Sequence, residues 1–197
     1  MPTAQILAAA QQVFAARGYA GASMAEIAAA CGVTKPALYH HFPGKEALYL
    51  EVMEDIAASL GALVERALAE PGHILARLDG LGEAVVRYFG AHPQAARLLT
   101  REAVDAGPFL TSPRSAVIGQ AVQATARLLA EGVQAGALVL QDPAHLAGSI
   151  VGLHMLWYAA QPLATNLLGG DPFTPAQIDA RVRAVQAQVR RLCGAVG

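Results

Sequence analysis

Glycine and proline recur along this chain at intervals of helical length, and this punctuation constrains the fold more than any other feature of the sequence. Ala and Leu predominate in the segments between them. We find no sustained alternation of apolar and polar residues of the kind that predicts a β-strand. The sequence therefore predicts an all-α fold of about nine helices. The expected segments are 3–16, 24–31, 35–41, 45–71, 74–90, 93–105, 113–135, 143–168 and 175–193.

The composition excludes several classes of protein. Hydrophobic residues make up 54% of the chain and charged residues 15%, whereas a disordered chain has low hydrophobicity and high net charge. The formal net charge of −1 excludes a polybasic nucleic-acid binder but leaves room for a local basic site. Cys31 and Cys193 are too few for a disulfide framework, and no Cys/His spacing predicts a zinc site. We therefore expect no metal and no cofactor.

Residues 143–170 contain no Asp, Glu, Lys or Arg and are long enough to span a bilayer. However, polar residues such as His145, Ser149 and Asn166 interrupt the segment, and no nearby Lys or Arg would set its orientation. A helix buried on nearly all sides, in a core or at a subunit interface, is the better interpretation. Residues 1–5 lack the basic start of a secretory signal. We expect a cytoplasmic protein without a membrane span.

Residues 23–42 have the pattern of two short helices joined by a tight turn. Ser23 and Glu26 have the spacing of a capping box, in which each side chain accepts a hydrogen bond from the other residue's backbone N–H. Gly32 ends the first helix, and Thr34 caps the second. Pro36 falls in the first turn of the second helix, where a missing N–H costs little. A turn of this length that contains Gly is typical of a helix-turn-helix.

The second helix of this motif is too short to bury much surface, so its outward side chains are candidates for DNA contacts. Leu38 and Phe42 are expected to face inward, and the first turn of such a helix meets base edges when it enters the major groove. The alternative is a three-helix packing motif in which Tyr39 and His40 are ordinary surface residues. Residues 1–50 carry three basic and two acidic side chains, a balance of +1, which gives DNA binding little extra support.

Six short motifs follow one another in order along the N-terminal part of the chain. They are Ile6-Leu7 with Val13-Phe14, Gly18-Tyr19, Ser23 to Ile27, Cys31-Gly32-Val33-Thr34, Leu38-Tyr39-His40-His41-Phe42 and Lys45-Glu46-Ala47-Leu48. Together they resemble the DNA-binding domain of the TetR family of transcriptional regulators. The resemblance implies that Ser23 and Lys45 lie at helix N-termini that meet the phosphate backbone. It also implies a recognition helix on which, or at whose start, lie Thr34, Lys35, Pro36, Ala37, Tyr39 and His40.

Two positions depart from the family's pattern. Family members often carry a basic residue near the start of the first helix, where this chain has Thr3-Ala4-Gln5. Members also usually have Ser or a similar cap where this chain has Gly44. Both departures weaken phosphate anchoring, which predicts a modest DNA affinity that falls steeply with salt.

The resemblance divides the chain into a helix-turn-helix domain over residues 1–48 and a helical effector-binding and dimerisation domain over 49–197. The apolar faces of the last two helices suit a four-helix interface in a homodimer. Large apolar side chains with a few polar groups suit a core as well as a pocket for a small apolar or amphipathic effector. Arg101 and Glu102 are expected to form a solvated pair. The candidate ligand-binding residues, four of them on one expected helix face, are Tyr88, Leu98, Phe109, His154, Trp157, Tyr158 and Gln161.

These observations predict a ligand-responsive repressor that binds a palindromic DNA operator as a homodimer and is released by the effector. The alternative is a helical small-molecule-binding protein or enzyme whose N-terminal trio of helices is only structural. The support for catalysis is thin. Residues 21–25 weakly resemble a nucleophile elbow, but that motif follows a strand, and no strand is expected before them. Residues 80–83 lack the third glycine of a dinucleotide-binding fingerprint. We therefore expect no enzymatic activity.

Overall fold

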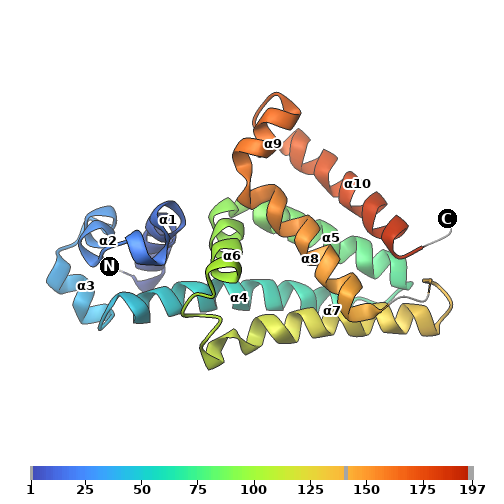
Figure 1. The fold of residues 1–197 in the computed structure, drawn as a ribbon, viewed down its shortest axis with the longest axis horizontal. Helices are drawn as coiled ribbons and strands as arrows, with labels where there is room; N and C mark the ends of the chain where they lie inside the picture. Colours follow the sequence, from blue (N-terminus) through green and yellow to red (C-terminus); the bar gives the residue numbers. More distant parts are fainter. Residues whose placement is uncertain (1, 140–141, 195–197) are drawn as a thin grey trace.

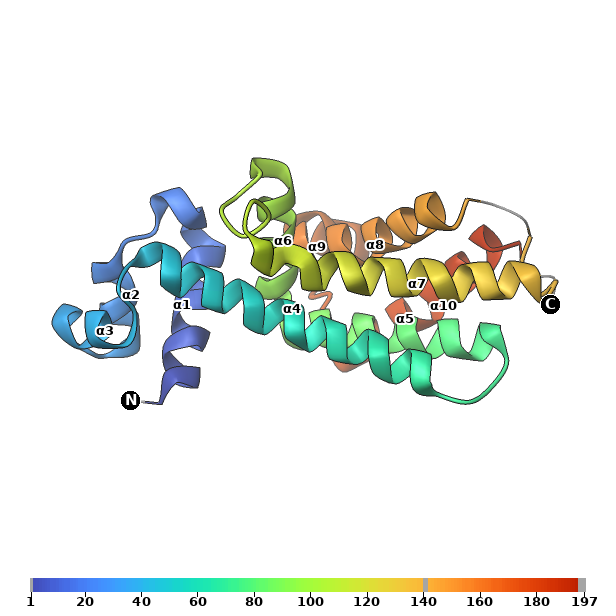
Figure 2. The ribbon, with the colours of Figure 1, turned by 90° about the horizontal axis from the view of Figure 1, so that it is seen from below.

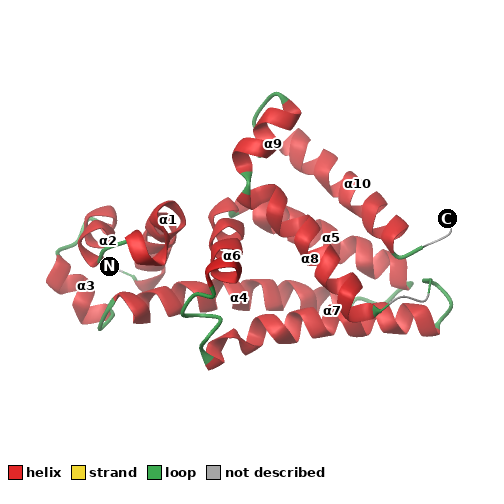
Figure 3. Ribbon diagram, viewed as in Figure 1, coloured by secondary structure: helices red, strands yellow, loops and turns green. Residues whose placement is uncertain are grey.

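The computed structural model describes residues 2–139 and 142–194, and within these ranges the chain consists of helices and loops without a strand (Figure 3). The predicted all-α fold is therefore confirmed. The elements are α1 (Thr3–Gly21), α2 (Met24–Cys31), α3 (Lys35–His41), α4 (Lys45–Ala69), α5 (Ile74–Ala91), α6 (Pro93–Asp105), the 3-10 turn η1 (Pro113–Ser115), α7 (Ala116–Gln134), α8 (Pro143–Ala159), α9 (Gln161–Leu168) and α10 (Pro175–Leu192).

Helices α1, α2 and α3 form a group at one end of the molecule, and α4 runs from this group along the rest of it (Figure 1). With 25 residues at 1.5 Å each, α4 is about 37 Å long. Helix α7 lies beside α4 in both views (Figure 2). Helix α8 packs against α6 and α7, and α10 packs against α5. The N-terminal group and the larger helical part therefore share α4.

A continuous buried cluster holds these helices together. It extends from Ile6 in α1 to Cys193 at the end of α10. In α4 the buried side chains recur every three or four residues, as at Leu48, Val52 and Ile56, so one stripe of the helix faces its neighbours. Because this stripe contributes to the packing of both parts, the N-terminal group does not have a separate core.

Two helices differ from the prediction. The first helix was expected to end near residue 16, but Gly18, at φ 73° and ψ 170°, only kinks α1, and the helix continues to Gly21. The single helix predicted over 143–168 is divided at Ala160, where φ is −95° and ψ is 47°. Pro162 explains the division, because it has no N–H to donate and its ring clashes with the carbonyl four residues earlier.

Within a single chain, α8 is buried on one side and exposed on the other. Ile150, His154 and Tyr158 face inward, whereas Gly152 and Leu156 are exposed. Burial of α8 on nearly all sides, as predicted, would therefore need a second molecule. None of the helices in residues 2–139 and 142–194 combines the length and apolar character needed to cross a bilayer.

Candidate DNA-binding surface and apolar cavity

The N-terminus of α2 has the predicted capping box. The backbone N–H of Glu26 donates to Ser23 Oγ at 3.2 Å, and the Ser23 N–H donates to Glu26 Oε2 at 3.0 Å. Hydrogen bonds from Ser23 lower the pKa of the Glu26 carboxyl, so this exposed side chain stays charged at neutral pH. The capping box fixes the residue at which α2 begins, and thus the position of the motif relative to α1.

A tight turn then places α3 across α2. Gly32 adopts the left-handed conformation, with φ 69°, that ends α2. Thr34 caps α3 by accepting a hydrogen bond of 3.3 Å from the backbone N–H of Ala37, and Pro36 lies in the first turn. The two helices and their turn therefore form the helix-turn-helix that the sequence predicts.

Helix α3 has one buried face and one exposed face. Leu38 has no exposed surface and Phe42 is 7% exposed, so these two side chains anchor the helix to the N-terminal group. Lys35 Nζ lies 5.8 Å from the centre of the Tyr39 ring, which places a cation beside an aromatic group on the exposed face. The residues expected on or at the start of a recognition helix are all exposed, namely Thr34, Lys35, Pro36, Ala37, Tyr39 and His40.

Lys45, at the start of α4, directs its ammonium group to the end of α1. Its Nζ donates to the carbonyl oxygens of Ala20 at 3.3 Å and Ala22 at 3.1 Å, and it lies 4.6 Å from the centre of the Tyr19 ring. No side chain caps α4 at Gly44. The first backbone N–H groups of α4 therefore lack helical partners and offer donors to an anion, whereas the ammonium group has partners within the chain.

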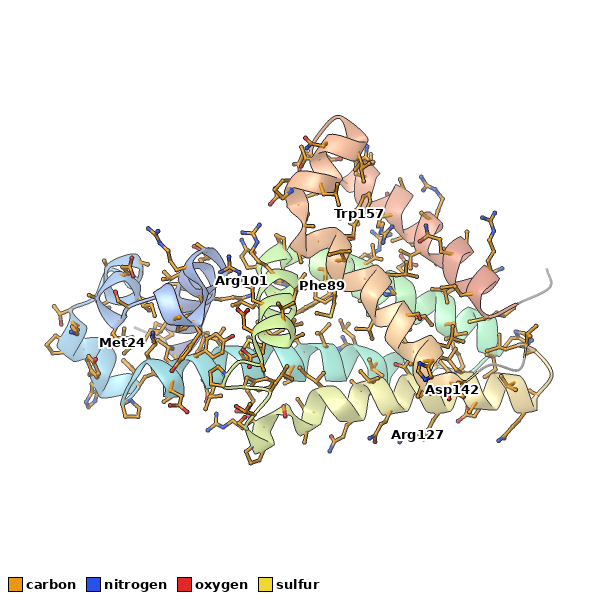
Figure 4. All side chains as sticks on the ribbon, in the orientation of Figure 1. Met24, Phe89, Arg101, Arg127, Asp142 and Trp157 are labelled. Atoms are coloured by element: carbon orange, nitrogen blue, oxygen red, sulfur yellow. The ribbon has the colours of Figure 1, made fainter. Side chains whose placement is uncertain are left out.

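An apolar cavity of about 290 Å³ lies in the larger helical part, lined by α4, α5, α6, α7 and α8 and by Leu110 from the loop after α6. Most of its lining is aliphatic. Phe89, labelled in Figure 4, contributes an aromatic ring from α5. Among the described residues of the lining, the polar side chains are Glu102, Thr125 and His154. An apolar enclosure with a few fixed polar groups is the usual form of a small-molecule site.

His154 is one of the polar residues in the lining of this cavity. The side chain is 5% exposed, and its Nδ1 lies 2.8 Å from the carbonyl oxygen of Ile150. Its Nε2 is buried close to the backbone of Gly82 on α5. Burial lowers the pKa of His154, so the ring is neutral at pH 7.

Glu102 connects the cavity to the N-terminal group. It is 2% exposed, and its Oε2 accepts a hydrogen bond of 2.6 Å from the Tyr49 hydroxyl. Its Oε1 accepts a bond of 2.8 Å from the backbone N–H of Leu110. Tyr49 in turn packs against the rings of Phe14 and Tyr19, each with its centre 4.9 Å away. Burial, followed by the bond to Glu102, raises the pKa of Tyr49, so its hydroxyl remains a donor.

The expectation that Arg101 and Glu102 form a solvated pair is wrong. Glu102 is buried, while the Arg101 side chain extends toward α1, where a Cβ at Gly18 would lie 3.0 Å from the guanidinium group (Figure 4). The sequence contained the relevant signal. Glu102 follows Leu98 by four residues and Leu99 by three, which places it on the buried face of α6.

The structure places the seven candidate ligand-binding residues in different surroundings. His154 lines the cavity, whereas the other six lie outside its lining. Trp157 stacks on the guanidinium of Arg181 at 4.5 Å, between α8 and α10 (Figure 4). Gln161 begins α9 and accepts a bond of 3.5 Å from Arg97, so it does not share a helix face with His154. The remaining four pack elsewhere in the core or at its edge, namely Tyr88, Leu98, Phe109 and Tyr158.

Two family models match the chain. One, described as bacterial regulatory proteins of the tetR family, matches residues 6–52, and the other, a tetracyclin repressor-like C-terminal domain, matches residues 75–189. The transcriptional regulator RutR of Escherichia coli strain K12 is 30% identical over 159 residues, which cover 81% of this chain and 72% of RutR.

Solved structures show the same fold. A regulatory protein of the tetR family from Rhodococcus RHA1 superposes with a TM-score of 0.82 and 24% identity, covering 99% of this chain and 98% of that one. AibR, solved in complex with isovaleryl coenzyme A and operator DNA, gives a TM-score of 0.75 with 22% identity, over 98% and 99% of the chains.

The helix-turn-helix motif and the helical part behind it define a helix-turn-helix DNA-binding protein. The chain belongs to the TetR family of transcriptional regulators, as the N-terminal motifs predict.

Proposed function

We propose that this protein is a cytoplasmic, non-catalytic repressor that binds a near-palindromic operator as a homodimer and releases it when a small molecule enters the apolar cavity. The observation that carries the proposal is the division of α3 into a buried anchor, Leu38, and an exposed face of six residues. A recognition helix needs this combination, because the anchor fixes the orientation of the side chains that meet DNA. The helix-turn-helix domain comprises residues 1–48, and residues 49–197 form the effector-binding and dimerisation domain.

On DNA, each subunit inserts α3 into the major groove, and the two grooves lie about 34–36 Å apart on one side of the duplex. Thr34, Lys35 and Tyr39 are placed for contacts to base edges and adjacent phosphates. Ser23 and the N-terminal N–H groups of α4 meet the phosphate backbone at helix N-termini. For Lys45 the proposed contact is the backbone N–H, because its ammonium group already has partners on α1.

The dimer forms through the last helices of each subunit. Apart from one histidine, the exposed side of α8 carries small or apolar residues, and it has no Asp, Glu, Lys or Arg, a composition suited to close packing of one helix against its symmetry mate. We call this surface the α8 face, and it comprises His145, Gly148, Ser149, Gly152 and Leu156. It continues in α9 with Leu163 and Leu167, which are 55% and 67% exposed, and α10 completes the interface.

The cavity is the effector site in this proposal. That AibR, a protein of the same fold, was solved with both isovaleryl coenzyme A and operator DNA supports a shared architecture for the two binding events. Glu102 belongs both to the lining and to the bond with Tyr49, so an occupant that displaces Glu102 acts directly on the N-terminal group. A nearly complete switch from a DNA-binding to a released state requires roughly 5 kcal/mol of differential affinity.

The experiment that tests the proposal is a salt titration of binding to DNA from around the protein's own gene, with random DNA as the control. We expect preferential binding to the gene's own DNA, with an affinity that falls steeply as salt rises. Footprinting of the preferred fragment should then show two half-sites related by a dyad. Protection of one unrepeated half-site by a monomer would contradict the proposal.

A further inference from the structure

The polar side chains that line the cavity in the described part of the chain are already bonded within the protein, and this restricts what the cavity can hold. We propose that the effector is a mainly hydrocarbon molecule whose hydrogen-bond acceptors are confined to one end, and that this end stays at a mouth of the cavity beside Leu110. This inference rests on the proposed function, because it specifies the ligand of the cavity that the proposal assigns to the effector.

Glu102 and Thr125 use their hydrogen-bonding atoms within the chain. The two carboxylate oxygens of Glu102 accept hydrogen bonds from the Tyr49 hydroxyl at 2.6 Å and from the backbone N–H of Leu110 at 2.8 Å. The Thr125 hydroxyl donates its proton to the carbonyl oxygen of Ala121 at 3.1 Å. A carboxylate can only accept, and a hydroxyl has a single proton, so neither side chain has a donor left for a ligand.

His154, the third polar side chain of the described lining, has no proton for a ligand either. The carbonyl oxygen of Ile150 can only accept, so Nδ1, which lies 2.8 Å from it, carries the proton of the neutral ring. Nε2 is buried against the backbone of Gly82 on α5. The polar side chains of the described lining therefore offer no free hydrogen-bond donor.

The backbone donors of the lining are also used, apart from those at the start of α7. Beyond the first turn of an α-helix, each N–H bonds to the carbonyl four residues earlier. Of the described helical residues in the lining, only Ile118 lies in a first turn, at the end of α7 that adjoins the loop of Leu110. A carbonyl group buried in the interior would therefore lose its hydrogen bonds to water without replacement, at the full cost of desolvation.

The cavity reaches the surface where α6 ends. Two of the described lining residues are exposed, namely Ala103 on α6 and Leu110, which is 39% exposed and lies in the loop that joins α6 to α7 (Figure 3). On α5, by contrast, the lining residues Leu81 and Phe89 are buried. A side chain that both lines the cavity and meets solvent marks an opening, so a polar ligand group beside Leu110 keeps its hydrogen bonds to water.

The volume limits the size of the buried part. A cavity of about 150 Å³ holds benzene, so about 290 Å³ accommodates an occupant on the order of twice that size. The aliphatic lining supplies most of the binding free energy through burial of apolar surface. Two ligands of equal size and composition should therefore differ in affinity when only one of them must bury its acceptor.

Two isomeric ketones test the inference on the unmodified protein. In 2-nonanone the carbonyl is next to one end of the molecule, so it can stay at the mouth while the chain fills the cavity. In 5-nonanone the carbonyl is in the middle of the chain and is buried in either orientation. Isothermal titration calorimetry should show 2-nonanone binding at least roughly fivefold more tightly than 5-nonanone.

A charge introduced at the mouth tests its position. Leu110→Lys should raise the affinity for nonanoate relative to 2-nonanone by roughly two- to fivefold, because the ammonium group pairs with a carboxylate that stays at the mouth. Val104→Lys is the matched control, since it adds the same charge at a 78% exposed position on α6 outside the lining, and it should leave this ratio unchanged. An unchanged ratio in Leu110→Lys would overturn the assignment of the mouth.

The outcomes separate this inference from the proposed function. Equal affinity for the two ketones, or tighter binding of 5-nonanone, would overturn the inference and leave ligand control of operator binding intact. If neither ketone bound while operator recognition was normal, the inference would be overturned, and the proposed function would lose its assignment of the cavity as effector site. If the ketones bound as expected but the protein recognised no operator, the inference about the cavity would stand and the proposed function would fail.

Discussion

The Tyr49 hydroxyl lies 2.6 Å from Oε2 of Glu102, a residue 53 positions further along the chain. Both partners are buried, and they belong to different helices, Tyr49 to α4 and Glu102 to α6. Tyr49 packs on the aromatic rings of α1, and Glu102 lines the cavity. This hydrogen bond, together with the packing of the Tyr49 ring on α1, connects the proposed effector site to the N-terminal group of helices.

Replacing Tyr49 with Phe tests this connection. The substitution leaves the buried Glu102 carboxylate without one of its two donors, so we expect the free energy of unfolding to fall by about 1–3 kcal/mol. The decrease should be seen in urea unfolding curves. Tyr19→Phe is the matched control, because it removes a neighbouring phenol that does not bond to Glu102. The fraction of protein that the effector releases from the operator should be smaller for Tyr49→Phe than for the wild type. An equal fraction would show that the coupling between the cavity and the N-terminal helices does not depend on this hydrogen bond.

Replacing Tyr39 with Ala should weaken operator binding at least several-fold, which corresponds to about 1 kcal/mol or more. Tyr39 is 43% exposed on α3, so the loss should arise from DNA contacts and not from unfolding. Fluorescence anisotropy with a labelled operator measures the effect. His41→Ala serves as the control, since His41 is exposed on the same helix but lies outside the predicted contact set. Equal affinity of Tyr39→Ala and the wild type would make Tyr39 an ordinary surface residue.

Gly32 should be intolerant of a side chain for a backbone reason. Its φ of 69° disfavours residues with a Cβ, although no atom lies within 4 Å of the position that a Cβ would take. We expect Gly32→Ala to destabilise the protein by about 1–2 kcal/mol. Gly119→Ala, at an exposed and equally open helical position in α7, should instead stabilise it by about 0.4–1 kcal/mol. Thermal unfolding of both variants would show whether the two changes have opposite signs.

His154 should make the protein sensitive to acid. Burial lowers its pKa in the folded state below the ordinary value of 6.5, so the unfolded chain binds the proton first as the pH falls. The free energy of unfolding should therefore decrease below about pH 6.5, by up to about 1.4 kcal/mol per pH unit, and this contribution should be absent above it. Urea midpoints across this range, compared between wild type and His154→Leu, measure the effect.

The matched control for this pH dependence is His41→Gln, at an exposed histidine. This variant should keep the acid sensitivity of the wild type, whereas His154→Leu should lose the part that comes from the buried ring. The same slope in His154→Leu and in the wild type would assign the sensitivity to other groups.

The α8 face should be required for dimerisation. Leu156 is 60% exposed in the single chain, and Leu156→Glu would place a charge at the centre of the proposed interface. We expect this variant to sediment as a monomer at concentrations at which the wild type is a dimer, and to lose operator affinity with it. Val104→Glu, at a 78% exposed position on α6, should remain dimeric. A dimeric Leu156→Glu would place the interface elsewhere.

Much of the fold could be predicted because its determinants are local. Ser23, Gly32 and Thr34 act within three or four residues of themselves, so the capping box, the left-handed turn and the start of α3 follow from spacing alone. The division at Ala160 was missed because Pro162 is tolerated in the first turn of a helix as well as being a breaker. The local sequence alone does not distinguish a proline that starts a helix from one that interrupts it, because the outcome depends on the packing around α9.

The cavity could not be predicted in the same way. Its lining comes from five helices and one loop residue, Leu110, and the residues that face it depend on how those helices cross. From the sequence, aromatic residues such as Trp157 and Tyr158 are candidates for the pocket. In the structure Trp157 packs against Arg181, and Tyr158 packs against Phe173. Aliphatic residues of α4 and α7 supply much of the lining, and such residues carry no chemical signal that separates a pocket from a core.

The buried cluster that runs from α1 to α10, with α4 common to both parts, has a consequence for folding. Cleavage of the chain after residue 48 would separate Leu48 from Val52 and Ile56, which extend one stripe of α4 across both parts. Loss of structure in either part would expose apolar surface of the other, so we expect the chain to fold and unfold as a single cooperative unit. We therefore expect that limited proteolysis would not release a folded DNA-binding fragment that is free of ligand control.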